Sequence, residues 1–297
     1  MFASLPRLIR VPLALALLFL NTALHVVVLF GLTALKLLLP LAAWRRGCSA
    51  ALVALAESWI AVNSALFGVF THIDWQVDGL AGLRRDGNYL VLCNHQSWVD
   101  IPVLQKVFNR RIPFLRFFLK SQLIWVPLLG PAWWALDFPF MKRYSKETLA
   151  RHPELQGKDR EATRRACEKF RQLPVSVMNF VEGTRFTRAK HEAQGSPFRH
   201  LLRPKAGGVA FVLDAMGDAL HAILDVTLVY PGGTPSMMDL IGGRVREIRV
   251  HVRELPIDAA LRGDYENDER FRERFQAWIN ALWQDKDARI AGMTDAA

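Results

Sequence analysis

Long apolar stretches near the N-terminus predict two helices. Residues 11–35 carry no charged side chain. As an α-helix these 25 residues extend about 37 Å, more than the hydrocarbon core of a bilayer at about 30 Å. Further on, apolar residues recur at alternating steps of three and four, the spacing of one helix face: Leu52, Leu55, Trp59, Val62, Leu66 and Val69. The pattern predicts an N-terminal hydrophobic helical hairpin.

We expect this hairpin, residues 1–73, to anchor the chain in a membrane. A buried helix of a soluble protein is seldom apolar all round over such a length. A signal peptide is the alternative, but its apolar core is usually shorter, and no clear small-residue cleavage site follows. Glu57 makes a full second span less favourable. Arginines flank the first helix on both sides, so one span and a hairpin within one leaflet both remain open.

Shorter apolar runs further along the chain predict strands. The run at 89–93 is bounded by polar residues, as is typical of a buried strand. Further candidate strands are residues 138–143, 175–181, 223–230 and 244–253. A highly charged helical region at 147–172 and a tail helix with one apolar face alternate with them. The alternation predicts an α/β domain over residues 74–297, with a mixed central sheet and flanking helices.

Composition narrows the class of partner. Hydrophobic residues make up 51% of the 297 residues, charged residues 22%, and the formal net charge is +10. A basic and apolar chain suits an anionic membrane surface better than nucleic acid, and no nucleic-acid-binding motif is present. The three cysteines form no CxxC pair, so neither zinc nor a redox pair is predicted. Interleaved aromatic and basic residues at 110–134 suit either a headgroup-facing surface or an ordinary packed segment.

Residues of catalytic type follow the strand at 89–93. Asn94, His95 and Asp100 occupy the turn before a helix that we expect to begin about Pro102. Ligands bind at the carboxyl ends of strands in open α/β sheets, and a tight turn brings Asp100 back to the imidazole of His95. An imidazole oriented by a carboxylate is a general base for a hydroxyl. In the alternative interpretation, Asp100 is only a helix N-cap and His95 a loop residue.

Two later turns carry cations suited to an anion. The strand at 175–181 ends in Glu-Gly-Thr-Arg, residues 182–185, and a glycine-containing polar turn with a fixed cation suits an anion. A surface ion pair is the alternative interpretation of this turn. Lys205 precedes Gly207 and Gly208 at a helix entrance, where backbone N–H groups also suit an anion.

Together these motifs resemble the PlsC-like glycerolipid acyltransferase family, which includes 1-acyl-sn-glycerol-3-phosphate and lysophospholipid acyltransferases. The family's first motif, Asn-His and then Asp after four residues, is matched by Asn94, His95 and Asp100. Its third motif, Glu-Gly-Thr-Arg, is matched in full by residues 182–185. The resemblance covers residues 74–253 together with the hydrophobic N-terminus.

The other two family motifs are matched less closely. Phe140 and Arg143 correspond to the second, with Met-Lys between them where the family more often has an aliphatic and a polar residue. The segment 225–231 corresponds to the fourth, but it ends in Tyr-Pro and departs from the common bacterial Val-Pro version. This departure is closer to the eukaryotic-like and remodelling enzymes. It affects the identity of the acceptor and not the reaction class.

The resemblance implies acyl transfer from acyl-CoA or acyl-carrier protein to the sn-2 hydroxyl of lysophosphatidic acid, without a metal or cofactor. His95 is then the general base and Asp100 its orienting partner. The implied substrate-binding residues are Arg143, Glu182, Gly183, Thr184, Arg185 and Lys205, with Lys120 as a further cation. Cys93 and Ser97 are nucleophiles by type, but neither lies in a Gly-x-Ser-x-Gly elbow, so direct transfer is favoured.

The partners expected are a lysophospholipid, an acyl thioester and membrane lipids, and the location is the inner membrane with the catalytic domain on its cytoplasmic side. A lysophospholipid with another headgroup is an alternative acceptor. A catalytically silent membrane adaptor is the alternative from another class of protein. Such a protein is expected to lose His95, Asp100 or Arg185, and all three are present.

Overall fold

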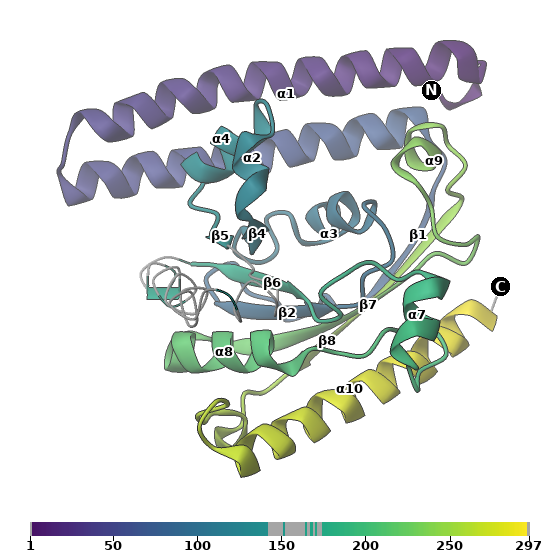
Figure 1. The fold of residues 1–297 in the computed structure, drawn as a ribbon. Coiled ribbons are helices and arrows are strands. Elements are labelled where there is room, and N and C mark those ends of the chain that lie inside the picture. The colour runs from purple at the N-terminus through teal and green to yellow at the C-terminus, as the bar shows by residue number, and fades with distance from the viewer. Residues whose placement is uncertain are drawn as a thin grey trace.

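The predicted N-terminal hairpin is confirmed in the computed structural model, which describes residues 2–141, 151, 164, 167–168, 170 and 174–295. Helices α1 (Arg7–Leu38) and α2 (Ala42–Phe70) lie antiparallel along one side of the molecule (Figure 1). Both are long and apolar enough to cross a membrane. Asn21, which interrupts the apolar pattern of α1, donates to Asn63 Oδ1 of α2 at 2.8 Å. A polar group in the apolar segment is thus paired between the two helices.

Both helices of the hairpin pack on the rest of the chain, α1 on α4 (Leu129–Ala135) and α9 (Met237–Ile241), and α2 on α3 (Asp100–Phe108) and α9. Glu57 is only 4% exposed, and its carboxylate accepts a hydrogen bond from Arg85 at 2.7 Å. This charge therefore faces the rest of the chain and not the outer surface of the hairpin. Leu29 of α1 and Leu52 and Ile60 of α2 belong to the same buried cluster as side chains of that region. Residues 1–73 share a core with the sheet and its helices, and the domain boundary after residue 73 stays a prediction.

Six strands form the central sheet, and they confirm the predicted mixed α/β class. The strands are β1 (Asp74–Asp78), β2 (Tyr89–Cys93), β3 (Leu115–Phe117), β6 (Ser176–Phe180), β7 (Ala222–Val229) and β8 (Glu247–Leu255). Their order is β1-β8-β7-β2-β6-β3, and only β7 with β8 is antiparallel. Because β2, β6 and β7 are parallel neighbours, the polar turns after these strands meet at one edge of the sheet.

Helices cover both faces of this sheet, which explains why β2 is buried at every position. α3 (Asp100–Phe108) lies between the sheet and the hairpin, while α8 (Ala206–Met216) and α10 (Glu269–Asp295) cover the opposite face (Figure 1). The shorter elements are β4 (Leu119–Lys120), α4 (Leu129–Ala135), β5 (Phe140–Met141), α7 (Arg188–Gln194) and α9 (Met237–Ile241). Strands β4 and β5 pair with each other in a second, two-stranded sheet.

Several sequence-based expectations need adjustment. α3 begins at Asp100 and not near Pro102, because the turn after β2 is shorter than expected. The strand expected at 138–143 is described only as the two residues of β5. Lys142, Arg143 and most of the charged segment at 147–172 lie outside the described residues. In the segment 110–134, Phe117 is buried as in an ordinary packed segment, whereas Trp125 is 85% exposed, and the headgroup-facing surface stays a prediction.

Candidate active site

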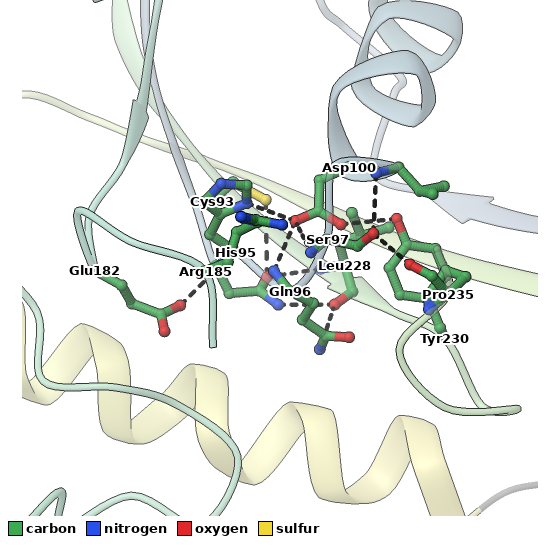
Figure 2. A network of polar contacts seen from close by, with 12 residues as sticks. Cys93, His95, Gln96, Ser97, Asp100, Glu182, Arg185, Leu228, Tyr230 and Pro235 are labelled. Atoms are coloured by element: carbon green, nitrogen blue, oxygen red, sulfur yellow. Dashed lines mark hydrogen bonds and ion pairs between the residues drawn. The ribbon is translucent and has the colours of Figure 1, made fainter. Parts of the chain in front are cut away.

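His95 and Asp100 form a hydrogen-bonded pair at the carboxyl end of β2. Asp100 Oδ2 lies 2.8 Å from His95 Nδ1 (Figure 2). Asp100 is buried, whereas the His95 side chain keeps 13% of its surface exposed. The imidazole stacks on the ring of Phe180, the last residue of β6, with 3.9 Å between ring centroids. Because the carboxylate engages Nδ1, the nitrogen available to a substrate is Nε2.

The Asp100 carboxylate is surrounded by hydrogen-bond donors. The backbone N–H groups of Gln96 and Ser97 donate to Oδ2 at 2.7 and 2.9 Å. The hydroxyl of Tyr230 donates to Oδ1 at 2.8 Å. The N-cap interpretation is wrong, because Val99 is the N-cap of α3 and the Asp100 side chain bonds back to the preceding turn. All these groups donate to the Asp100 carboxylate, which is an acceptor only when it is ionised. The imidazole must therefore also donate to it, so Nδ1 of His95 carries the proton.

Cys93 and Ser97 have structural roles. Cys93 is fully buried, and this burial raises the pKa of its thiol well above the ordinary value. Ser97 Oγ donates to the carbonyl of Pro235 at 2.5 Å and accepts from the N–H of Val99 at 3.1 Å. Neither side chain lines the cavity that His95 faces. The geometry therefore favours neither residue as a nucleophile.

Glu182 connects the turn after β6 to two other segments. Its Oε1 accepts from the backbone N–H of His95, and its Oε2 accepts from the N–H of Leu202, both at 3.0 Å. The side chain is 1% exposed. Burial raises its pKa from 4.5 to about 7, against the two N–H groups, which lower it. Glu182 thus acts on the backbone of His95, and it does not line the cavity.

Cations follow Glu182 in the same turn and in the helix after it. The guanidinium of Arg185 lies 4.8 Å from the ring centroid of Trp98, an exposed side chain of the turn after β2. Lys190 of α7 donates from Nζ to Thr184 Oγ1 at 2.8 Å and to the carbonyl of Arg185 at 3.0 Å. These contacts hold the Thr184–Arg185 backbone beside His95.

Gly183 lets the Lys205 side chain approach this turn. Gly183 has a φ of +69°, a conformation that side chains with a Cβ rarely adopt. A Cβ at this position would lie 3.1 Å from Lys205 Cδ and 3.2 Å from Lys205 Nζ. The backbone turn therefore favours glycine, and a Cβ here would push the Lys205 side chain away by a few tenths of an ångström.

A cavity of about 1640 Å³ joins these groups. Its wall includes His95, Arg185 and Lys205 on the polar side and Leu29 and Ile60 of the hairpin on the apolar side. Its volume exceeds that of ordinary pockets for small ligands, about 300–1,000 Å³. The cavity is therefore large enough for a ligand with a long apolar part and a charged group.

Most predicted site residues lie together. Gly183, Thr184, Arg185, Lys205 and Lys120 all line the cavity with His95, whereas Arg143 lies outside the described residues. Sequence reasoning missed Phe180, Lys190 and Tyr230. Only Tyr230 carried a signal, because it occupies the place where the fourth motif departs from the family pattern. In the part of the chain that the structure describes, no group of three or more His, Cys, Asp or Glu residues could hold a metal ion.

Comparison with known proteins places this site in context. A family model described as acyltransferase matches residues 74–236. The chain is 26% identical to 1-acyl-sn-glycerol-3-phosphate acyltransferase delta of Mus musculus over 215 residues, which are 68% of this chain and 52% of that protein. It is 29% identical to the gamma enzyme of Homo sapiens over 180 residues, 57% of this chain and 43% of that protein. The chain spans about half the length of the curated relatives it matches.

A solved structure has the same fold. It is the 1-acyl-sn-glycerophosphate acyltransferase PlsC of Thermotoga maritima, with a TM-score of 0.58 and 18% sequence identity. The match covers 96% of this chain and 98% of the other. Because it extends over almost the full length of both chains, it includes the two N-terminal helices as well as the sheet.

Proposed function

This chain belongs to the acyltransferase family, and from that premise we propose that it transfers a fatty acyl group from a thioester to the sn-2 hydroxyl of lysophosphatidic acid, giving phosphatidic acid. The observation that carries the proposal is the His95–Asp100 pair on the wall of a cavity with cations on one side and the apolar hairpin on the other. The relatives named as 1-acyl-sn-glycerol-3-phosphate acyltransferases support this choice of acceptor.

The proton follows a short path in the proposed reaction. His95 Nε2 removes the proton of the acceptor hydroxyl as its oxygen attacks the thioester carbonyl. Asp100 keeps the imidazole in the correct tautomer and stabilises the imidazolium. The tetrahedral intermediate then collapses, the C–S bond breaks, and the proton passes from His95 to the leaving thiolate. The products are an ester and a free thiol, and these steps use no metal or redox cofactor.

The two sides of the cavity suit the two parts of a lysolipid. Arg185 and Lys205 lie on the polar wall, and a guanidinium binds phosphate with two parallel hydrogen bonds. The guanidinium of Arg185 lies over the ring of Trp98, a contact that orients it. The acyl chain is placed among the apolar side chains of the hairpin.

The donor in this proposal is acyl-CoA or acyl-carrier protein, since both present a fatty acid as a thioester. The enzyme is placed at the inner membrane, with the catalytic domain on the cytoplasmic side, where these carriers are found. The two apolar helices and the net charge of +10 support binding to an anionic membrane surface.

The decisive test is acylation by the purified full-length protein in detergent, with labelled acyl-CoA and lysophosphatidic acid. We expect turnover by the parent and a loss of about 10²–10⁴-fold in His95→Ala, the usual contribution of a general base. Lysophospholipids with choline, ethanolamine and glycerol headgroups are assayed beside it. Highest efficiency on one of these would reassign the acceptor. A parent inactive on every acceptor would favour the adaptor.

A further inference from the structure

Tyr230, which follows β7, lies 130 positions after Asp100 in the sequence and contacts its carboxylate. Three donors meet Asp100 Oδ2: His95 Nδ1 and the backbone N–H groups of Gln96 and Ser97. Among the described residues, only the Tyr230 hydroxyl donates to Oδ1, at 2.8 Å (Figure 2). Both Asp100 and Tyr230 are buried, so water does not replace this bond if it is lost.

Tyr230 is held between two anchors that join β7 to the turn after β2. Before it, the Asn94 side chain donates to the carbonyl of Leu228 at 2.8 Å and accepts from its N–H at 2.9 Å. After it, Ser97 Oγ donates to the carbonyl of Pro235 at 2.5 Å. The phenol is therefore positioned by the same turn that carries the catalytic pair.

Tyr230 does not touch the cavity. Of the three residues in the chain Tyr230–Asp100–His95, only His95 lines it. A substrate in the cavity thus has no direct contact with the phenol, and any effect of Tyr230 on the reaction passes through Asp100.

From this geometry we propose that Tyr230 is a positioning residue of the active site, whose hydroxyl holds Asp100 in the orientation that presents His95 Nε2 to the acceptor. The inference rests on the proposed function for its kinetic readout. Its second readout, the titration of His95 itself, does not depend on that function.

The groups that face this network come from four elements. They are Cys93 of β2, Glu182 after β6, Asp225 of β7 with Tyr230 after it, and Lys286 of α10. Burial, and to a smaller extent the negative charge of Asp100, raises the pKa of Tyr230 well above its ordinary value of 10. Burial also raises the pKa of Cys93, so both side chains are neutral near pH 7. Glu182 has a pKa of about 7 and titrates in parent and variant alike. A difference in the His95 titration between the parent and Tyr230→Phe is therefore caused by the loss of the phenol hydroxyl.

Tyr230→Phe removes the hydroxyl and keeps the ring. We expect kcat to fall about tenfold, with KM for both substrates within about twofold of the parent. Without the phenol, more of the Asp100 charge acts on the imidazolium. In full-length protein with labelled histidines, the His95 resonance, identified by its absence in His95→Ala, is then expected to titrate at a higher pH than in the parent.

Tyr89→Phe is the matched control, because the Tyr89 side chain is also buried and its hydroxyl accepts one hydrogen bond, from the N–H of Arg84 at 2.9 Å. This variant should leave kcat and the His95 titration unchanged. The titration midpoint does not depend on the folded fraction, so partial unfolding does not imitate the shift.

A His95 midpoint in Tyr230→Phe that is unchanged, lower, or matched by Tyr89→Phe overturns the inference. So does a loss expressed in KM alone. If the parent turns over no acceptor, the proposed function fails, while the titration still decides the role of Tyr230.

Discussion

Burial separates two groups of side chains around His95. Asp100, Glu182 and Tyr230 hold it from behind the cavity wall, and each is at most 5% exposed. Arg185 and Lys205 lie on the cavity side and are exposed. Because electrostatic interactions are weakly screened in the interior and strongly screened at the surface, the two groups predict different consequences of substitution.

Arg185→Ala should weaken the use of lysophosphatidic acid. Arg185 is exposed, so the lower end of the usual range for a lost charge partner applies, about 2 kcal/mol or roughly thirtyfold in kcat/KM. Arg185→Lys should recover only part, because an ammonium lacks the forked geometry. The loss should be smaller on lysolipids whose phosphate is a diester. These effects are measured as kcat/KM on both classes of acceptor.

Arg188→Ala is the control for this prediction. Arg188 is a neighbouring cation, 92% exposed and paired with Glu192, and it does not line the cavity. Its removal should leave kcat/KM nearly unchanged. If Arg185→Ala reduces activity equally on every acceptor, Arg185 serves the fold or the donor, and the phosphate is reassigned to Arg143 and Lys205.

The raised pKa of Glu182 makes the free energy of unfolding depend on pH. Its pKa is raised from 4.5 to about 7 in the folded state, so the folded protein binds this proton more tightly than the unfolded chain. The stabilisation is complete below about pH 4.5 and is lost as pH rises to about 7. A shift of this size corresponds to about 3 kcal/mol.

Glu182→Gln removes that titration. The melting temperature of the parent should therefore fall relative to the variant by several degrees between about pH 4.5 and 7, and the difference should stay constant above that. Thermal unfolding followed at a series of pH values measures this difference. Parallel curves for the two proteins across that window would show that the carboxyl does not titrate there.

Among the secondary-structure elements, α10 is attached to the sheet by a buried ionic cluster. Lys286 is fully buried, and its Nζ lies 2.5 Å from Asp225 Oδ1 of β7. Arg253 of β8 lies 3.1 Å from the other carboxylate oxygen. Because β7 leads directly to Tyr230, this cluster fixes the strand that supports the active site from the face opposite the cavity.

Lys286→Met should destabilise the protein by about 3 kcal/mol, because it leaves a buried carboxylate with fewer partners. The double variant with Asp225→Leu should recover much of the loss. Asp285→Ala is the control, since this carboxylate is 63% exposed and 3.8 Å from Arg253, and its effect should be below about 0.5 kcal/mol. Thermal unfolding in detergent measures all three. Unchanged stability in Lys286→Met would contradict the assigned role of the cluster.

On the outer side of the molecule, the hairpin exposes large apolar side chains. Phe19 and Val27 of α1 are 67% and 71% exposed. Soluble proteins seldom expose extended apolar patches of this kind without a partner. The inner side of the hairpin is used differently, because it packs on the catalytic region and lines the cavity. The hairpin thus has one face packed on the rest of the molecule and one exposed apolar face, which is the face that the proposed membrane contact would use.

Phe19→Asp with Val27→Asp should reduce binding to anionic phospholipid vesicles several-fold, because charges in a bilayer are costly. Ala281→Asp, at an exposed position of α10, is the control and should bind as the parent does. Vesicle flotation measures the bound fraction. Undiminished binding by the double variant would transfer the membrane contact to another surface, such as that of Trp125. Deletion of the hairpin is a poorer test, since it also exposes core side chains around Leu104.

The local pattern of the chain was enough to predict the hairpin, the main buried strands and the contact between His95 and Asp100. Each depends on short spacings: an uncharged run, a face of apolar residues at helical steps, or His95 and Asp100 in one turn. The apolar run at 89–93 likewise shows a strand covered on both faces, because no position in it is polar.

Tertiary structure alone decided what surrounds that pair. Tyr230 meets Asp100 because β7 lies beside β2 in the sheet, and Glu182 meets the backbone of His95 because β6 lies on the other side of β2. Strand order is set by how the whole core packs and not by spacing along the chain. The hydrogen bonds and the cavity that depend on it therefore appear only when distant segments are brought together.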